Sequence, residues 1–454
     1  MSIMTKKEET LKELEEVIKF IKSDDLSDTQ KEKITKDTVN YFDNYVSPGW
    51  LKYRKSVSTN AAVVEWKDKG STCEGLYGEK FIDCLGGFGI YTCGHRNDEI
   101  LDTVKAQLDH QALHSQELLD PLRGYLAKAV ADITPGDLQY CFFTNGGAEA
   151  VEMALKLARI ATGGRWYIST VGAFHGKSMG AISMGGKDTY RVPYTPMVQQ
   201  VQHVEYGNAE DMRKAIINLQ AVGEKVAAVI IEPIQGEAGV IVPPEGYLTK
   251  VREICDETGV ALIFDEVQTG MGRTGTMWRC EAEGVTPDIM TFGKAFGGGI
   301  MPITGIICRP HMWTQDLVDN PWLLGSPTFG GNPVCCSAAI ATIKYMLEND
   351  VPGMCKEKGK FLKSKLVGLK EKYPTVIDDV RGEGLMLAVE FCTSDVGYSV
   401  AKGLFSRGVM TAGTLVNAKC IRFEPAAVIT EEEMTQVIER MDAALTDAKE
   451  EFSL

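Results

Sequence analysis

The chain of 454 residues has no long hydrophobic run and no excess of basic residues. Its longest apolar stretches, such as Val226–Ile231, are about the length of a strand. A membrane-spanning helix needs roughly 20 apolar residues. Forty-eight lysines and arginines stand against 62 aspartates and glutamates, which gives a net charge of −14. Because such a surface repels phosphate backbones and anionic lipid, the composition argues against nucleic acid and membranes as partners.

Other absences bear on the compartment and on metals. The first residues, Met1–Glu16, are charged almost at once and lack the apolar segment of a signal peptide. Twelve cysteines are spread from Cys73 to Cys420 without any C-x-x-C spacing, which is typical of reduced thiols and not of a disulfide framework or a zinc site. We therefore expect a cytoplasmic protein without a metal site. Repeats, low-complexity tracts and Pro/Gly/Ser linkers are also missing, so we expect tightly packed lobes.

What is present is an alternation of short apolar runs with helical periods from about residue 136 onward. It predicts a parallel sheet with helices on both faces, which binds ligands at the carboxyl ends of its strands. Beyond about residue 345, runs at 376–390 and 418–424 favour a smaller α+β lobe. The strands expected in the sheet are 140–144, 166–170, 226–231, 260–265, 289–291 and 304–308, with helices at 148–161 and 248–257.

The N-terminal residues predict two helices. An apolar stripe among lysines and glutamates indicates an amphipathic helix over 5–23. Ser27, with Gln30 three residues later, is typical of a capping box that begins a second helix. We expect this arm to pack on the body of the protein or on a second subunit.

Short motifs that favour other chemistry have the wrong surroundings. Gly270–Gly275 fits the G-x-G-x-x-G of dinucleotide-binding proteins, but neither a clear helix nor a suitably placed acidic residue follows it. The run His175–Ser178 ends like a phosphate-binding P-loop, but its glycines are too close together. His110 and His114 would share a helix face, yet no glutamate between them completes a metal motif.

One alternative function for this sequence is that of a serine hydrolase. Ser178 lies in a G-x-S-x-G pattern, with Asp265 and His311 following in the order that such hydrolases use. The pattern requires the serine at a sharp turn directly after a strand, whereas the preceding strand is expected to end near Thr170. A fluorophosphonate probe tests this alternative, because it labels an active serine.

The strongest pattern is an aspartate and a lysine that each follow a strand. Asp265 comes after Val-Ala-Leu-Ile-Phe, where a carboxylate is costly unless a charged or hydrogen-bonding group faces it. Lys294 has glycines around it that let a planar group approach the backbone. A desolvated lysine has a lowered pKa and bonds to carbonyl carbons. Such a pair suits a pyridoxal phosphate enzyme, and an internal salt bridge explains the spacing equally well.

Six stretches in a fixed order resemble the class III aminotransferases, which are fold-type I pyridoxal phosphate enzymes. The similarity extends from about residue 40 to about residue 445. The stretches are Thr144–Ala150, Ala173–Lys177, Ile231–Gly239, Phe264–Gly275, Thr291–Gly299 and Thr328–Pro333.

The resemblance implies an α/β fold of fold-type I. Its large domain has a mostly parallel sheet with helices on both faces, and both termini contribute to a smaller α+β lobe. We expect a helical arm and part of the small domain at 1–85, the large cofactor-binding domain at 86–345 and the C-terminal small domain at 346–454.

The resemblance also implies a cofactor, pyridoxal 5′-phosphate, and residues that bind it. Lys294 would bond to it covalently and then transfer protons, and Asp265 would keep its ring nitrogen protonated. Gln268 would hydrogen-bond the ring 3′-oxygen. The cofactor-binding residues implied are Gly147, Ala148, Phe174, His175, Asp265, Gln268, Lys294 and Thr328.

Several of these residues have a distinct physical task. Phe174 would stack on the ring, and the backbone N–H groups of Gly147 and Ala148 would bind the phosphate at a helix N-terminus. Thr328 would reach the same phosphate from the neighbouring subunit, which implies a homodimer or a dimer of dimers. The family usually has serine where Gly146 stands, so we expect weaker cofactor retention.

The resemblance implies two substrates used in turn. Four stretches outside the shared motifs resemble the diamine-specific members, which implies putrescine or a similar diamine as amino donor. Arg422 would bind the carboxylate of 2-oxoglutarate, and Glu237 would pair with that arginine while the diamine is bound. The alternatives are 4-aminobutyrate, ornithine or acetylornithine as donor. The four stretches are Tyr53–Val57, Phe81–Ile90, His114–Arg123 and Ala412–Lys419.

Overall fold

A computed structural model describes residues 3–23, 25–54 and 62–454. These residues belong to two compact units, one comprising residues up to 67 together with 73–80, and the other comprising 68–72 together with 81–454. Residues 55–57, the end of the first diamine-like stretch, lie outside the described residues.

The first unit contains the two predicted N-terminal helices, α1 (Ile3–Ile21) and α2 (Asp28–Tyr41). The backbone N–H of Gln30 donates to the hydroxyl of Ser27, and the backbone N–H of Ser27 donates to Oε1 of Gln30 at 2.9 Å. The predicted capping box is therefore confirmed. Between α1 and α2, Nζ of Lys33 lies 3.0 Å from a carboxylate oxygen of Glu16.

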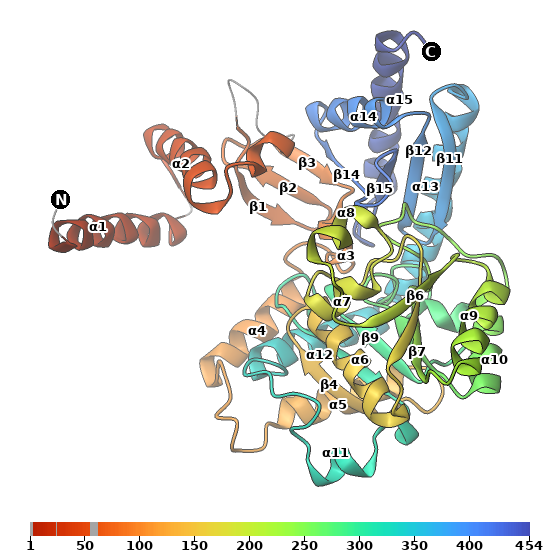
Figure 1. Cartoon of the computed structure of the whole chain (residues 1–454). Coiled ribbons are helices and arrows are strands. Elements are labelled where there is room, and N and C mark those ends of the chain that lie inside the picture. The colour runs from red at the N-terminus through yellow and green to blue at the C-terminus, as the bar shows by residue number, and fades with distance from the viewer. Residues whose placement is uncertain (1–2, 24, 55–61) are drawn as a thin grey trace. The chain divides into compact units, whose positions relative to one another are not determined.

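In the second unit, seven of the described strands form one sheet, in the order β4-β10-β9-β8-β7-β5-β6. The chain alternates between these strands and helices, and α6 packs against this sheet, in contact with β4, β7, β9 and β10 (Figure 1). The strands are β4 (Tyr140–Thr144), β5 (Trp166–Thr170), β6 (Gln200–Val204), β7 (Val226–Ile231), β8 (Ala261–Asp265), β9 (Ile289–Phe292) and β10 (Thr304–Cys308).

The predicted mostly parallel sheet is confirmed, with one exception. Strands β6, β5, β7, β8 and β9 run parallel to one another. Strand β10 is antiparallel to both β9 and β4. The chain between β9 and β10 contains no α-helix, and a parallel connection needs such a crossover. The sequence pattern did not reveal β6, whose residues are mostly half-buried.

The two faces of this sheet bury different sets of side chains. Along β7, Ala228 and Ile230 pack with α6, whereas Val229 and Ile231 belong to the core on the opposite face. Successive side chains of a strand point to opposite faces, so a strand covered on both faces is apolar throughout. This explains why all six residues of β7 are buried.

The C-terminal residues form a second sheet, in the order β11-β12-β15-β14, with α13, α14 and α15 packed near it. Its strands are antiparallel to one another, and the pair β11-β12 corresponds to the run expected at 376–390. The strands are β11 (Ile377–Glu383), β12 (Met386–Phe391), β14 (Ala412–Gly413) and β15 (Cys420–Phe423).

Short strands and the remaining helices complete the described chain. No helix in the described ranges is long and apolar enough to cross a membrane. The short strands are β1 (Glu65–Lys69), β2 (Thr72–Gly75), β3 (Lys80–Asp83) and β13 (Val409–Met410). The helices are α3 (Gly86–Gly89), α4 (Asp98–His110), α5 (Pro121–Ile133), α6 (Gly147–Thr162), α7 (Met179–Met184), α8 (Asp188–Arg191), α9 (Ala209–Ala221), α10 (Tyr247–Thr258), α11 (Gln315–Asp319), α12 (Pro333–Glu348), α13 (Val351–Lys372), α14 (Ser394–Ser406) and α15 (Glu431–Glu451).

Candidate active site

A cavity of about 240 Å³ lies at the carboxyl ends of the large sheet's strands. Strand β8 ends at Asp265, strand β9 ends two residues before Lys294, and α6 begins at Gly147, three residues after β4 ends. The predicted cofactor-binding residues that line this cavity are Gly147, Ala148, Phe174, His175, Asp265, Gln268 and Lys294.

Asp265 is buried in the lining of this cavity, and both of its carboxylate oxygens accept hydrogen bonds. Oδ2 lies 2.7 Å from Nδ1 of His175, while Oδ1 accepts the Thr291 hydroxyl at 2.8 Å and the Val267 N–H at 3.2 Å. Burial alone would raise the pKa of Asp265, but His175 and these donors hold it below its usual value. The carboxylate therefore stays ionised and can keep a neighbouring cation protonated.

Lys294 is partly buried in the cavity wall, and no hydrogen bond or ion pair links its ammonium to any residue in the described ranges. Burial lowers its pKa, and the charge of Glu424 is the largest of those that oppose this decrease. Its backbone has a φ of +47°, which strains a residue with a side chain and is common at functional sites. The alternative of an Asp265–Lys294 salt bridge is wrong, because Asp265 pairs with His175.

The start of α6 forms a site suited to a phosphate. The first N–H groups of a helix have no acceptor within the helix and lie at its positive end. The neighbouring residue Gly176, with a φ of +108°, approaches so closely that a Cβ there would lie 2.6 Å from Cβ of Ala148. Gly146, which precedes the helix, has no side chain that could accept a hydrogen bond from these N–H groups. The N–H groups of Gly147 and Ala148 are thus available to an anion in the cavity.

The walls of the cavity are fixed by a carboxylate that sequence reasoning did not assign. Glu232 is buried, and its two oxygens accept the N–H groups of Phe174 and Gly236, each at 3.0 Å. Burial raises the pKa of Glu232 to about 7. Its place at the end of the buried run Val226–Ile231 was the available signal, since a buried carboxylate needs donors. Glu232 thereby ties the loop of Phe174 to the loop that precedes Glu237.

Glu237 and Arg422 form a buried ion pair. Nη2 of Arg422 lies 2.6 Å from Oε2 of Glu237, and the same oxygen accepts the Leu415 N–H at 2.8 Å. The guanidinium of Arg422 also lies over the ring of Phe88, 5.1 Å from its centroid. Burial would raise the pKa of Glu237, but the charge of Arg422 holds it low. The structure thus joins two residues that are 185 positions apart in the sequence.

Thr328 does not reach this cavity within the chain. It lines another cavity, of about 740 Å³, together with residues such as Leu118 and Trp322. Its carbonyl oxygen accepts a hydrogen bond from the side-chain amide of Gln116. The contribution of Thr328 to a neighbouring subunit's site stays a prediction.

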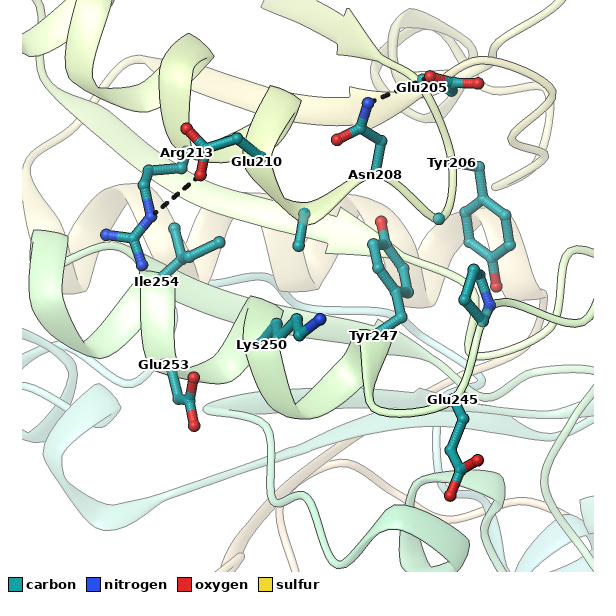
Figure 2. Close-up of a pocket in the computed structure, with 13 residues that line it drawn as sticks. Glu205, Tyr206, Asn208, Glu210, Arg213, Glu245, Tyr247, Lys250, Glu253 and Ile254 are labelled. Carbon is teal, nitrogen blue, oxygen red and sulfur yellow. Dashed lines mark hydrogen bonds and ion pairs between the residues drawn. The ribbon is translucent and has the colours of Figure 1, made fainter.

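Figure 2 shows a further cavity, of about 610 Å³, that contains no predicted site residue. It lies between α9 and α10, and glutamates such as Glu205 and Glu253 line it. The hydroxyl of Tyr206, on its wall, lies 3.0 Å from the carbonyl oxygen of Glu232.

The structure separates the residues of the alternative motifs. Ser178 precedes α7, eight positions after β5 ends, and its hydroxyl donates to Glu152 at 2.6 Å. Exposed His311 lies 3.4 Å from a carboxylate oxygen of Asp288, whereas Asp265 pairs with His175. The described residues therefore bring together no Ser178–His311–Asp265 triad.

The structure confirms one further expectation and corrects another. Gly270–Gly275 forms turns, and the α-helix that a dinucleotide site would require does not follow them. The expectation that His110 and His114 share a helix face is wrong, because α4 ends at His110, before a short irregular segment. His114 instead contacts a guanidinium nitrogen of Arg123 at 3.0 Å.

Comparison with known proteins assigns the family. The model of the family described as aminotransferase class-III matches residues 53–445. The chain is a class-III aminotransferase. An ornithine aminotransferase from Toxoplasma gondii ME49 is 26% identical over 94% of this chain and 100% of that one, with a TM-score of 0.82.

Two further solved structures resemble this class-III aminotransferase. A pyridoxal-phosphate-bound amine transaminase from an uncultivated Pseudomonas species is 26% identical, covering 87% of this chain and 98% of that one, with a TM-score of 0.79. An acetylornithine aminotransferase from Elizabethkingia anophelis is 26% identical, covering 87% and 97%, with a TM-score of 0.72. The cofactor of this class-III aminotransferase is pyridoxal phosphate, and the anion site, desolvated lysine and ionised aspartate of the cavity fit it.

Proposed function

We propose that this class-III aminotransferase transfers the terminal amino group of putrescine, or a similar aliphatic diamine, to 2-oxoglutarate. The products are 4-aminobutanal, which closes to 1-pyrroline, and glutamate. The observation that carries the proposal is the buried pair between Glu237 and Arg422, with 2.6 Å between Oε2 and Nη2. A donor without a carboxylate leaves the arginine without an anion, and the glutamate supplies one. The diamine-like sequence stretches add support.

The residues of the cavity divide the chemical work. Pyridoxal phosphate, when bound, supplies an electron sink that makes the carbon next to the donor nitrogen acidic. The amine of Lys294 takes the proton from that carbon, because burial has lowered its pKa. Asp265 holds a proton on the ring nitrogen by its negative charge, which His175 and Thr291 keep ionised.

Other residues bind and orient the cofactor. Gly147 and Ala148 hold its phosphate through their N–H groups at the start of α6. Phe174 covers one face of the ring, and its own N–H is fixed by Glu232 at 3.0 Å. Gln268 faces the ring 3′-oxygen. These roles explain why residues from distant parts of the chain line one cavity.

Arg422 serves the second substrate. Its Nε and Nη1 are buried and have no hydrogen-bond partner in the described part of the chain, so either can join Nη2 in binding a carboxylate once Glu237 releases Nη2. When 2-oxoglutarate enters, Glu237 turns away and the arginine binds the α-carboxylate with two parallel hydrogen bonds. Glu237 and Arg422 are therefore paired while the amino donor is bound and separated while 2-oxoglutarate is bound.

The quaternary and domain organisation are part of the proposal. Thr328 of one subunit contacts the phosphate in its neighbour, so the enzyme works as a homodimer or a dimer of dimers. Residues 1–85, 86–345 and 346–454 act as arm, large domain and small domain. The enzyme acts in the cytoplasm.

Ornithine is the second candidate donor, because ornithine and acetylornithine aminotransferases are among the similar structures. Ornithine carries an α-carboxylate, which needs its own cationic partner when its far amino group reacts. Among the described residues, the cavity lining offers one cation, the reactive Lys294, and Arg422 outside this lining is paired with Glu237. This composition favours the diamine.

The absorbance spectrum of the purified holoenzyme, before and after addition of putrescine without an oxo acid, tests the function. We expect a yellow band that bleaches with putrescine. A band that bleaches with ornithine, acetylornithine or 4-aminobutyrate but not with putrescine contradicts the donor. A protein that stays colourless after pyridoxal phosphate is added contradicts the role of Lys294.

A further inference from the structure

A second carboxylate that sequence reasoning did not assign lies next to the catalytic lysine. Glu424 directly follows β15 and is fully buried. Alternate residues of an extended chain face the same side, so Glu424 shares a side with Arg422, which belongs to the proposed acceptor site. The N–H of Glu424 donates to the carbonyl oxygen of Cys84 at 2.8 Å, which fixes its backbone.

One oxygen of this carboxylate has a partner and the other has none. Oε1 accepts a hydrogen bond from Nε2 of Gln268 at 2.7 Å. Oε2 is buried without a hydrogen-bond partner, and within the described ranges the one other carboxylate oxygen in this state is Oδ2 of Asp120. Asp120 lines the separate cavity that contains Thr328. A buried carboxylate oxygen without a donor is costly, so this position needs a donor from outside the chain.

The other acidic groups at the site are already occupied. Asp265 binds His175 and Thr291, and both oxygens of Glu232 accept backbone N–H groups. Glu237 pairs with Arg422. Glu424 is therefore the acidic group of the site with a buried oxygen left for a cation.

The free oxygen borders a space that a glycine leaves open beside Lys294. A Cβ on Gly89 would lie 3.8 Å from Oε2 of Glu424, 3.7 Å from Cδ of Lys294 and 3.7 Å from Cγ of Gln268. Gly89 has a φ of +97°, which disfavours any residue with a side chain. The space between these three side chains can thus hold a small group that donates hydrogen bonds.

We infer that Glu424 binds the second ammonium group of a diamine donor and so selects diamines over monoamines. The inference rests on the proposed function, because a diamine, unlike a monoamine, keeps a second ammonium after its first amino group enters the reaction. The N–H of this ammonium donates to Oε2 of Glu424, while Oε1 keeps its bond to Gln268. The contact requires no covalent step.

Glu424→Gln tests the inference with little change of shape. The glutamine retains a carbonyl oxygen that accepts from Gln268, but it replaces the free oxygen with an amide that cannot accept from an ammonium. Glu253→Gln removes the same charge in the cavity of Figure 2 and serves as the matched control. Glu424→Asp keeps the negative charge but shortens the side chain, so it separates an effect of charge from an effect of packing.

The measurement is the spectral change of each holoenzyme with putrescine and with n-butylamine, which lacks the second ammonium. The concentration dependence yields a limiting rate and an apparent dissociation constant for each amine. For Glu424→Gln we expect the apparent binding of putrescine to weaken 10- to 100-fold more than that of n-butylamine, because only putrescine loses a hydrogen bond between two charged groups. The Glu253→Gln enzyme should match the wild type, and Glu424→Asp should retain part of the putrescine preference.

Two results would overturn the inference. Equal losses with both amines, or unchanged putrescine binding in Glu424→Gln, would show that Glu424 does not select the diamine. Failure of the proposed function is distinguishable, because the wild-type spectrum would then not respond to putrescine at all.

Discussion

Nη2 of Arg422 lies 2.6 Å from Oε2 of Glu237, and both side chains are buried. The arginine is thus paired through Nη2, whereas its Nε and Nη1 have no partner in the part of the chain that the structure describes. A guanidinium in this state can exchange one carboxylate for another without ever being buried alone, which is costly. Both half-reactions can therefore use the same cation.

Glu237→Gln should slow the donor half-reaction more than the acceptor half-reaction. The neutral amide leaves Arg422 uncompensated while the diamine is bound, whereas 2-oxoglutarate brings its own carboxylate. We expect at least a tenfold loss of kcat/KM for putrescine, which corresponds to about 1.4 kcal/mol, and little change for 2-oxoglutarate. Single-turnover spectra of the two half-reactions measure both. Equal losses in the two half-reactions would contradict the exchange of carboxylates on Arg422.

Asp265→Asn should lower the rate of both half-reactions by about 100-fold or more, because asparagine cannot hold a proton on the ring nitrogen by charge. Thr291→Val is the matched control, since it removes a single hydroxyl that donates to Asp265 at 2.8 Å. Its loss should be much smaller. Stopped-flow absorbance follows both variants. An Asp265→Asn enzyme within tenfold of the wild type would refute the assigned role.

Gly146→Ser should strengthen cofactor binding. The backbone of Gly146 is extended, with φ −132° and ψ 148°, and nothing lies within 4 Å of its Cβ position, so a serine fits without strain. Its hydroxyl can cap α6 or donate to the phosphate, and relative to glycine a cap adds a few tenths of a kcal/mol to stability. We expect a several-fold lower dissociation constant for pyridoxal phosphate, measured by equilibrium dialysis. Gly146→Ala is the control. If alanine increased the affinity for pyridoxal phosphate as much as serine does, the hydroxyl would not be the cause.

A buried histidine should make stability fall at alkaline pH. His95 lies 2.9 Å from Asp68 and 2.8 Å from Asp83. Burial lowers its pKa, but the two aspartates outweigh this and raise it to about 9. Because the folded-state pKa exceeds the unfolded value of about 6.5, the stabilisation is complete below that value. It is lost as the pH rises through about 9.

The variant His95→Gln isolates this contribution. The difference in unfolding midpoint between wild type and variant should be large at pH 6.5 and shrink toward pH 10. The full contribution is on the order of 3 kcal/mol, since one pKa unit corresponds to about 1.4 kcal/mol. Denaturant unfolding at several pH values measures it. A difference that stays constant over this range would show that the charge of His95 does not stabilise the fold.

The sequence by itself determined the large sheet and the residues at its edge. Runs such as Val226–Ile231 are apolar because strands of a doubly covered sheet are buried on both faces, so their pattern shows in the sequence. Asp265 and Lys294 stand out because each follows such a run. For the same reason the sequence marks the carboxyl edge, where the structure places the cavity.

Only the tertiary structure decided which groups meet there. The antiparallel direction of β10, the pairing of His175 with Asp265 and the free oxygen of Glu424 are not visible in any local pattern. Each depends on contacts between segments far apart in the chain. Whether a buried carboxylate has a partner is a property of three-dimensional packing, and periodicity records only which residues are buried. Spacing therefore suggested an Asp265–Lys294 pair, whereas packing leaves that lysine free to react.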